Sequence, residues 1–303
     1  MPPVSVSPET LEALARRLLD DVRRKAGISH DRPLERKLTR ILSAMPLAVL
    51  ELWVAQIEAA DPDSPDWLSL IENLTIHETY FFRDPQHHEH VRHRVLPALI
   101  DARRSERRLR LWSAGCASGE EAYGLAILAL EALADAGEAR RGTDGVATAW
   151  EVAVVGTDIS RIAVRQARHG CYGEEGMGSF RDLPAAYASW FVPLVGEAAP
   201  CRRVREDARR LVRFERHNLM GNAAPDGRSA DDAFDLVSCR NVMIYFDDDS
   251  RERAMRLLIG AVAVDGWLVL GATDRLPDGA PFERVHGDRA VAYRRRSDKA
   301  GVP

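Results

Sequence analysis

The stretch WSAGCASGEEAYGLAI, residues 112–127, places an apolar strand, a glycine turn and a helix in that order. Gly115 and Gly119 permit a tight turn that a ligand can approach closely, and the helix that follows presents its N-terminus to that ligand. This order is typical of the first unit of a nucleotide-binding α/β sheet. The stretch therefore predicts both the fold class and the position of a binding loop.

The acidic residues after the turn restrict the kind of ligand. The glycine spacing is G-x-x-x-G and not the dinucleotide pattern G-x-G-x-x-G, and Glu120 and Glu121 would repel a pyrophosphate at the start of the helix. S-adenosylmethionine carries a sulfonium, an amino group and ribose hydroxyls but no phosphate, so nearby carboxylates favour it. We therefore expect S-adenosylmethionine as the cofactor. Each glutamate could alternatively provide only favourable charge at a helix N-terminus.

Short apolar runs, separated by helical segments, continue the pattern along the chain. In several runs nearly every side chain is apolar, as in strands that are buried on both faces of a sheet. This alternation predicts a doubly wound, mostly parallel sheet. The runs are 109–114, 151–158, 211–218, 234–239, 266–272 and 290–295. Two stretches interrupt them: we expect a polar loop at 134–149 and a small inserted subdomain at 173–210.

Polar side chains follow the second and third predicted strands, at the edge where open α/β sheets bind their ligands. Asp158 is expected to accept hydrogen bonds from ribose hydroxyls. It could alternatively cap the helix that follows, although Ser160 can fill that role instead. Asn218 has donors and acceptors that suit an adenine edge.

The motif CRNVMIYF, residues 239–246, follows the fourth predicted strand. It places Arg240, Asn241 and Tyr245 where the strand end opens onto the ligand crevice. Arg240 stands among apolar residues, and an arginine there needs a partner. It could therefore also be a structural arginine with a buried partner.

The segment TIHETYFFRDP, residues 75–85, lies between the two predicted parts of the chain. Its aromatic side chains, Tyr80, Phe81 and Phe82, are expected to pack as a hydrophobic hinge. Arg83 differs from them, because a guanidinium held among aromatic neighbours is suited to orient a carboxylate in bidentate fashion.

The N-terminal part of the chain is predicted to be a helical lobe over residues 8–75. Leucines recur at helical spacing in 8–26 and 34–58, and breaks fall at 27–33 and 61–67. Residues 1–45 contain nine Lys or Arg against six acids, whereas 51–80 contain seven acids and no Lys or Arg. The basic lobe could face an acidic protein partner or could be an ordinary solvated surface.

Several kinds of protein and site are excluded by composition and motifs. No apolar run reaches the length of about 18 residues that a membrane span needs, and the N-terminus lacks the order of a signal peptide. We therefore expect a cytoplasmic protein with no membrane insertion. The net charge of −4 says little about nucleic acid, and we expect no nucleic-acid partner. Neither a P-loop nor a G-x-S-x-G elbow occurs.

The cysteines and the clustered histidines do not predict a metal site. Four cysteines are widely spaced without a C-x-x-C pair, so we expect reduced thiols: Cys116, Cys171, Cys201 and Cys239. Four histidines lie close together without a matching cysteine or carboxylate pattern: His87, His88, His90 and His93. We expect them to form a solvated helix face and expect no bound metal.

The segments TIHETYFFRDP, WSAGCASGEEAYGLAI, GTDIS, HNL and CRNVMIYF, in this order, resemble the chemotaxis receptor methyltransferases, the CheR family of protein-glutamate O-methyltransferases. The resemblance covers about residues 10–296. It implies a Rossmann-like class I methyltransferase sheet whose last strand is antiparallel. It also implies an N-terminal helical domain at 1–75, a linker and cofactor-covering segment at 76–107, and a methyltransferase domain at 108–303, with a small β-subdomain inserted at 173–210.

The same resemblance assigns residues to the expected site. Around S-adenosylmethionine it places Thr79, Arg83, Ala114, Glu120, Asp158, Asn218, Leu219, Arg240 and Asn241. His77 stands where relatives usually carry Asn, and a histidine there could still hydrogen-bond the cofactor. Nearest to the incoming glutamate, the resemblance places Arg83 and Tyr245 as catalytic residues.

The implied reaction is methyl transfer to glutamate carboxylates in the cytoplasmic helical region of a methyl-accepting chemoreceptor, with S-adenosylhomocysteine as the product. A glutamate with a pKa of about 4.3 is already ionised at neutral pH, so alignment and desolvation are required and a general base is not. Candidates to meet the receptor helix are Arg36, Lys37 and Arg40. The loop VPLVGEAAPCRR, residues 192–203, lacks the Gly-x-Gly of tail-binding members, so tethering of a receptor tail is not expected.

Two other functions are compatible with the predicted sheet. An NAD-type dehydrogenase would require the glycine fingerprint that is missing here. A non-catalytic cofactor-binding regulatory or scaffold protein would not require the complete set of polar residues that the chain retains. That set comprises Arg83, Asp158, Arg240, Asn241 and Tyr245.

Overall fold

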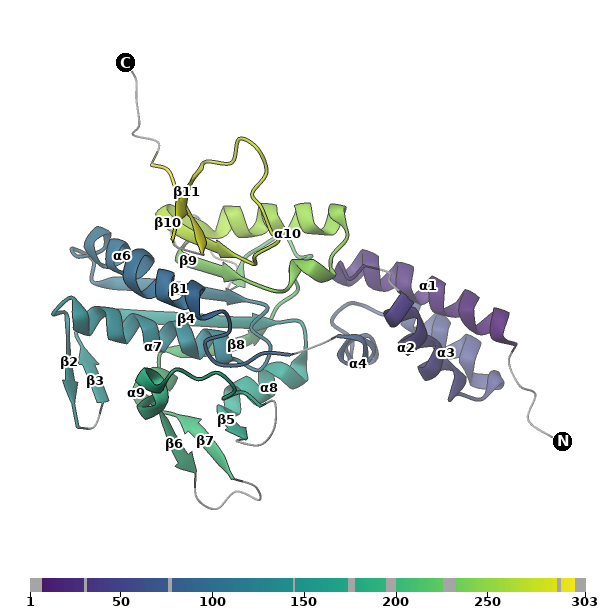
Figure 1. Cartoon of the computed structure of the whole chain (residues 1–303). Helices are drawn as coiled ribbons and strands as arrows, with labels where there is room; N and C mark the ends of the chain where they lie inside the picture. The colour runs from purple at the N-terminus through teal and green to yellow at the C-terminus, as the bar shows by residue number, and fades with distance from the viewer. Residues whose placement is uncertain are drawn as a thin grey trace.

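A computed structural model describes residues 7–29, 32–75, 78–143, 145–173, 178–194, 200–225, 233–287 and 290–297. Figure 1 shows the N-terminal helices α1 to α4 to the right of a large sheet, which has helices packed against it, and a small second sheet below. Over the described ranges, no helix combines the length and apolar character that crossing a membrane requires.

The large sheet has seven strands in the order β11-β12-β10-β9-β1-β4-β8. Their bounds are β1 (Arg108–Ala114), β4 (Glu151–Asp158), β8 (Val212–Arg216), β9 (Phe234–Cys239), β10 (Val262–Leu270), β11 (Phe282–His286) and β12 (Val291–Arg295). From β8 to β10 all neighbours are parallel, and β12 is antiparallel to both β10 and β11. The predicted doubly wound sheet with an antiparallel last strand is therefore confirmed.

Two apolar cores cover the faces of this sheet, because successive side chains of a strand point to opposite faces. Leu111 and Leu236 belong to the core that includes helices α6 and α7, whereas Trp112 and Val237 belong to the core that includes α10. All four side chains are fully buried, as the apolar runs predicted. The helices of this part are α5 (Pro85–His90), α6 (Leu96–Ala102), α7 (Glu120–Asp135), α8 (Arg161–His169) and α10 (Asp248–Ala261).

The N-terminal helices enclose a third apolar core of their own, to which Leu18, Leu38 and Trp67 contribute fully buried side chains. The helices are α1 (Pro8–Ala26), α2 (Arg32–Ser43), α3 (Leu47–Ala59) and α4 (Pro65–Leu74). Gly27, with a φ of 75°, ends α1, because glycine adopts this left-handed conformation without a Cβ penalty. The predicted breaks at 27–33 and 61–67 separate α1 from α2 and α3 from α4.

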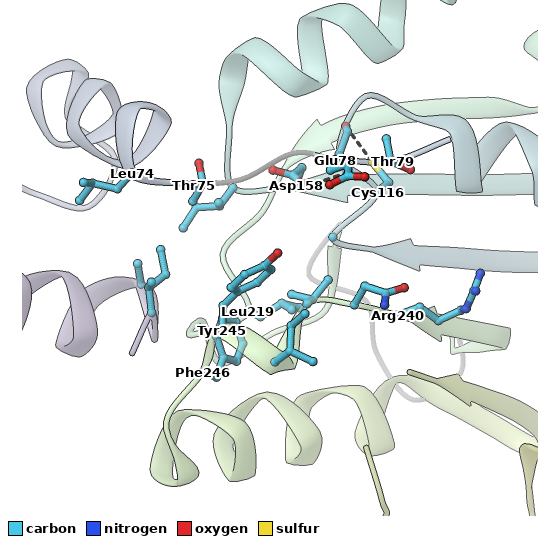
Figure 2. Close-up of a pocket in the computed structure, with 18 of the residues that line it drawn as sticks. Leu74, Thr75, Glu78, Thr79, Cys116, Asp158, Leu219, Arg240, Tyr245 and Phe246 are labelled. Carbon is cyan, nitrogen blue, oxygen red and sulfur yellow. Dashed lines mark hydrogen bonds between the residues drawn. The ribbon is translucent and has the colours of Figure 1, made fainter. Parts of the chain in front are cut away.

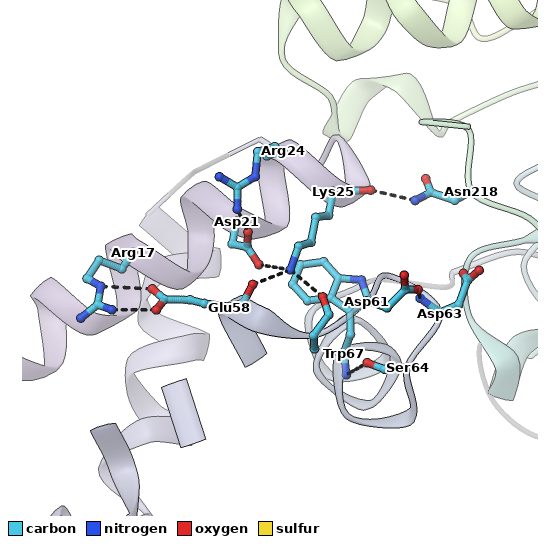
Figure 3. Close-up of polar contacts among 11 residues, drawn as sticks. Arg17, Asp21, Arg24, Lys25, Glu58, Asp61, Asp63, Ser64, Trp67 and Asn218 are labelled. Atoms are coloured by element: carbon cyan, nitrogen blue, oxygen red, sulfur yellow. Dashed lines mark hydrogen bonds and ion pairs between the residues drawn. The ribbon is translucent and has the colours of Figure 1, made fainter. Parts of the chain in front are cut away.

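The end of α1 is fixed both within the N-terminal helices and to the sheet (Figure 3). Lys25 donates from Nζ to the carbonyls of Glu58 (2.9 Å) and Ala60 (2.8 Å), and it lies 4.6 Å from the ring centroid of Trp67. The backbone carbonyl of Lys25 accepts a 2.8 Å hydrogen bond from Nδ2 of Asn218, which follows β8. These contacts hold the loop after α1 beside the carboxyl ends of the strands.

A small antiparallel sheet, in the order β5-β7-β6, lies in the chain between α8 and β8. Its strands are β5 (Cys171–Gly173), β6 (Phe191–Leu194) and β7 (Cys201–Val204), followed by α9 (Glu206–Arg209). A disulfide joins Cys171 to Cys201, whereas Cys116 and Cys239 are free and buried. The expectation of reduced thiols is therefore wrong for the first pair. Pairing of β5 with β7 brings the two cysteines together across a sequence separation of 30 residues.

Two expectations about local structure are wrong. Residues 134–149 contain a β-hairpin and not only a polar loop, with β2 (Ala139–Gly142) paired to β3 (Gly145–Thr148). Val146 is buried, and its N–H donates to Asp207 (2.8 Å), so a tertiary contact stabilises a hairpin that local sequence signals weakly. His88 and His90 are buried, so the clustered histidines do not form a solvated face. Within the described ranges, no group of three His, Cys, Asp or Glu side chains is placed to hold a metal ion.

Candidate active site

A cavity of about 290 Å³ opens at the carboxyl ends of β1, β4 and β9 and is bounded on the opposite side by the N-terminal helices. The chain runs from β1 to β4 and β8 on one side and then returns to β9 on the other side of β1. Open α/β sheets bind ligands at such a change of direction. Figure 2 shows Asp158, Cys116, Glu78 and Thr79 on one side of the cavity, with Tyr245 on the other.

The glycine turn after β1 forms one wall of this cavity. Gly115 and Gly119 have φ angles of 78° and 98°, in the left-handed region that favours glycine. A Cβ on Gly115 would lie 2.3 Å from Cγ2 of Val242, which belongs to the CRNVMIYF motif. The predicted turn is therefore present, and its backbone packs directly against the loop that follows β9.

Replacing Gly115 by alanine is expected to weaken S-adenosylhomocysteine binding by at least about tenfold, because the new methyl group must displace Val242 as well as strain the backbone. Isothermal titration calorimetry measures this affinity. The matched control is Gly137→Ala: Gly137 also has a left-handed φ, of 75°, but no heavy atom of a packing neighbour among the described residues lies within 4 Å of its ideal Cβ. Equal affinity losses in both variants would contradict the assignment of the turn to the cofactor site.

Asp158, at the end of β4, lines the cavity as expected. Its two carboxylate oxygens accept hydrogen bonds from the N–H groups of Ala117 and Ser160, both at 2.9 Å. A carboxylate offers about four acceptor positions, so ribose hydroxyls can bind it in addition. Ser160 caps α8 by accepting from the N–H of Ala163 (3.1 Å), so the helix does not need Asp158 as its cap.

The two glutamates at the start of α7 have different environments. Glu120 is only 1% exposed and points away from the cavity, where Ser118 and Ser179 donate to its carboxylate at 2.8 Å and 2.7 Å. Burial raises its pKa, although these hydrogen bonds act in the opposite direction. Glu121 lines the cavity instead and accepts from Ser113 (2.8 Å). The resemblance placed Glu120 at the cofactor, but in the structure the adjacent residue, Glu121, lines the cavity.

Arg240 connects three parts of the site and is 8% exposed. It donates to the carboxylates of Glu121 (3.2 Å) and Asp84 (2.6 Å) and to the carbonyl of Arg83 (2.8 Å). The arginine therefore has the partners that its apolar sequence context required, of which Glu121 is largely buried and Asp84 is half exposed. Its guanidinium holds the segment before α5 against the start of α7.

Residues 78–84 form an irregular segment across the cavity, here called the strap, which contributes Thr79, Tyr80 and Arg83 to the lining. Arg83 donates from Nη1 to the carbonyl of Glu78 (2.9 Å). Phe81 and Phe82 are buried in the core that includes α7, which agrees with their expected packing role. His77 precedes the strap and lies outside the described residues.

Tyr245 faces the strap from across the cavity and is 38% exposed. It ends the short helix η5 (Met243–Tyr245), and its carbonyl accepts a 2.6 Å hydrogen bond from the N–H of Ser29 in the loop after α1. Asn241, with a φ of 57°, lies in the same motif and lines the cavity. The N-terminal helices therefore help to hold the loop that carries both residues.

Of the remaining expected residues, Leu219 and Asn218 line the cavity, whereas Ala114 is buried at the end of β1 and is not part of the lining. Asn218 uses its amide to donate to Lys25 and to accept from the N–H of Met220 (3.0 Å). These contacts, rather than an adenine edge, account for the orientation of its side chain.

The sequence did not indicate that residues from the loop after α1 and from α2 also line the cavity. Ile28, Ser29, Leu34 and Lys37 do so. Their only sequence signal is the break between the first two predicted helices, which leaves a loop free to reach another part of the chain.

The described histidines that line the cavity, His88 and His217, are uncharged at neutral pH, because burial lowers the pKa of each. His88 lines the cavity, and burial, together with the nearby Arg240 cation, lowers its pKa to about 3. The same two causes lower the pKa of His87 to about 4. Among the described residues that line the cavity, the positive charges are therefore those of Arg83, Arg240 and Lys37.

The chemistry of the lining fits S-adenosylmethionine. The glycine backbone at Gly115 permits close approach, and the carboxylates of Asp158 and Glu121 suit hydroxyl and amino groups. Leu219 and Phe246 supply apolar surface for a flat ring.

Comparison with known proteins identifies the family of this chain. The family model described as "CheR methyltransferase, SAM binding domain" matches residues 77–291. Chemotaxis protein methyltransferase 1 of Pseudomonas aeruginosa is 32% identical over 230 residues, covering 74% of this chain and 76% of that protein. The chemotaxis protein methyltransferase of Borreliella burgdorferi is 30% identical over 222 residues, covering 72% and 71%. That of Salmonella typhimurium is 29% identical over 296 residues, covering 95% and 92%.

The match spans the glycine turn, the strap and the CRNVMIYF motif, which carry the resemblance in the sequence. The chain is an enzyme whose cofactor is S-adenosylmethionine. It belongs to the CheR methyltransferase family.

Proposed function

We propose that this chain transfers the methyl group of S-adenosylmethionine to glutamate carboxylates in the cytoplasmic helical region of a methyl-accepting chemoreceptor. The observation that carries the proposal is the distribution of charge in the cavity. Asp158 and Glu121 are largely buried, whereas the exposed side carries Arg83 and Tyr245, which suit an incoming carboxylate. The names of the relatives as chemotaxis protein methyltransferases support the class of acceptor.

We propose the following division of labour along the chain. Residues 1–75 form a helical domain, 76–107 a linker that covers the cofactor, and 108–303 the methyltransferase domain with its insert at 173–210. The separate apolar core of α1 to α4 supports the first boundary.

When bound, S-adenosylmethionine would supply a methyl group on a cationic sulfur. Transfer would form a bond between a carboxylate oxygen and the methyl carbon and break the bond between that carbon and sulfur, which leaves neutral S-adenosylhomocysteine. The protein has no proton to remove, because a glutamate with a pKa of about 4.3 is already ionised at neutral pH. The strap and Tyr245 exclude water and align the attacking oxygen. Arg83 restrains the carboxylate through charge, and the Tyr245 hydroxyl restrains it through a hydrogen bond.

Replacing Tyr245 by phenylalanine is expected to lower kcat by about tenfold and to change cofactor affinity much less, because a hydroxyl that bonds only the acceptor carboxylate is lost. Methylation rates at saturating cofactor and calorimetry with S-adenosylhomocysteine measure the two quantities. The control is Tyr293→Phe on β12, outside the cavity. Lost cofactor binding with unchanged turnover at saturation would contradict this role.

The exposed side of α2 is the proposed contact for the receptor helix. Arg36, Lys37 and Arg40 are exposed on this helix, and Lys37 also borders the cavity. A helix that carries the substrate glutamates is acidic, so opposite charge would guide it towards the cavity.

Reversing the charge of Arg36 and Arg40 to glutamate is expected to raise KM for a receptor fragment by about tenfold with little change in kcat, because the contact lies outside the reacting groups. Steady-state kinetics at two salt concentrations measure the effect, which should shrink as salt screens the charges. The control is Arg256→Glu on α10, where an exposed arginine pairs with Glu252. A KM that does not respond to the α2 change would rule this surface out.

The proposed function is tested by incubating the enzyme with S-adenosylmethionine carrying a labelled methyl group and a cytoplasmic receptor fragment. We expect label on the fragment that mild base releases as methanol, since carboxylate esters hydrolyse readily. Base-stable label would indicate another acceptor group, and absence of transfer by an enzyme that binds the cofactor would reject the receptor as substrate.

A further inference from the structure

The strap has a backbone conformation that must be supported by other parts of the chain. Phe82 and Asp84 have φ angles of 57° and 60°, in the left-handed region that residues with a Cβ adopt at a cost. Residues 78–84 belong to neither a helix nor a strand. No regular hydrogen-bond pattern therefore holds the strap, and its shape depends on tertiary contacts.

One support comes from the sheet. Arg240, which follows β9, bonds the carboxylate of Asp84 and the carbonyl of Arg83. These two contacts fix the C-terminal end of the strap. They leave the N-terminal end, with Glu78, Thr79 and Tyr80, to be held from elsewhere.

The other support comes from residues 179–181, which lie in the insert between β5 and β6. The N–H of Phe81 donates to the carbonyl of Ser179 (2.8 Å), and the rings of Phe81 and Phe180 stack with their centroids 5.5 Å apart. Ser179 also donates to the carboxylate of Glu120 (2.7 Å) at the start of α7. The insert thus joins the middle of the strap to the helix that follows the glycine turn.

Arg181 contacts the N-terminal end of the strap. Its Nη2 lies 2.7 Å from Oε1 of Glu78, and its guanidinium carbon lies 4.3 Å from the ring centroid of Tyr80. The Arg181 side chain is 18% exposed and that of Glu78 is 59% exposed. Glu78 lines the cavity, and Arg181 contacts it from outside the lining. Arg83 uses the same two residues: it donates to the Glu78 carbonyl and lies 5.9 Å from the Tyr80 ring centroid.

We propose that Arg181 is a positioning residue for methyl transfer, which acts by holding Glu78 and Tyr80 so that Arg83 faces the acceptor carboxylate. The inference rests on the proposed role of Arg83. A partly exposed ion pair adds little to stability, so the value of this contact lies in geometry. Reaction rates respond strongly to geometry, since a misplacement of about 1 Å can cost two orders of magnitude.

The first test compares Arg181→Ala with Arg181→Lys and with the exposed control Arg256→Ala. For Arg181→Ala we expect kcat about tenfold lower. The dissociation constant for S-adenosylhomocysteine should stay within about twofold of that of the parent enzyme, and the melting temperature should stay close to the parent value. Lysine should restore part of the rate, because it keeps the charge but not the planar guanidinium. Unchanged kcat in Arg181→Ala, or a tenfold loss in the control as well, would overturn the proposal.

A double-mutant cycle with Arg83 separates positioning from a general structural effect. If Arg181 acts through Arg83, its removal should change kcat little in an Arg83→Ala background. The same tenfold loss in both backgrounds would overturn this inference and leave the proposed function intact. Full turnover by Arg83→Ala alone would overturn the role of Arg83 and this inference with it, whereas absence of any methyl transfer by the parent enzyme would overturn the proposed function. Glu78→Gln breaks the ion pair by changing its exposed partner and leaves the insert unaltered. This variant should show the same loss of rate, and it provides the test if Arg181→Ala does not fold.

Discussion

Replacing Arg83 by alanine is expected to lower kcat for receptor methylation by about 100-fold, while the affinity for S-adenosylhomocysteine falls much less. Arg83 is held at the open side of the cavity by the Glu78 carbonyl, with its own carbonyl bound by Arg240. Its guanidinium can therefore orient a carboxylate without moving. Removing it leaves an ionised acceptor that must be aligned by Tyr245 alone.

Arg83→Lys is the matched variant, because it retains the charge but not the planar fork of donors. An intermediate kcat would indicate that both charge and geometry contribute. Single-turnover methylation at saturating cofactor measures the chemical step directly. Loss of cofactor affinity with a normal single-turnover rate would contradict the assignment of Arg83 to the acceptor.

The second large effect is expected for Arg240→Ala, which should lower the free energy of unfolding by about 3 kcal/mol and also abolish measurable cofactor binding. The largely buried carboxylate of Glu121 would lose its cationic partner, and the carbonyl of Arg83 would lose its hydrogen-bond donor. The strap would then lose its support from the sheet. Urea unfolding and calorimetry measure the two effects.

Arg103→Ala is the matched control for this variant. Arg103 pairs with the buried Asp235 at 2.6 Å, near the start of β9, whereas Arg240 follows the end of the same strand. Both changes remove the cation of a largely buried carboxylate, so both should destabilise the fold. Only Arg240→Ala should affect cofactor binding. If both variants lose cofactor binding, the loss in Arg240→Ala would be a consequence of lower stability alone.

The strands and the loop that binds the cofactor could be predicted from sequence because their signals are local. Apolar runs buried on both faces specify parallel strands, and the glycine turn after β1 specifies close ligand approach. Asp158 was found by its position after such a run. Each of these features could be predicted from the residues next to it in the sequence.

The choice between Glu120 and Glu121 could not be made in this way. Adjacent helix residues point about 100° apart, and which of them faces the cavity depends on how α7 packs. Ser179, which binds Glu120, lies 59 residues further along the chain. The lining from Ile28 and Leu34 and the burial of His88 likewise depend on contacts that are remote in sequence.

The disulfide between Cys171 and Cys201 was missed for a different reason. Spacing of cysteines in a sequence does not determine which pair is adjacent, and pairing of β5 with β7 decides it here. The β2–β3 hairpin was missed because its strands are four residues long and contain a single large apolar side chain, that of Val146. Both features are products of tertiary contacts rather than of local pattern.

The central claim is that the acceptor is a glutamate carboxylate, and mass spectrometry of a methylated receptor fragment tests it most directly. After reaction with the enzyme and S-adenosylmethionine, peptide fragmentation locates each added methyl group. We predict methyl esters on glutamate side chains, removed by mild base and greatly reduced with the Arg83→Ala enzyme. Methyl groups on nitrogen or sulfur atoms would contradict the central claim, whereas glutamate esters formed equally by the Arg83→Ala enzyme would contradict only the role of Arg83.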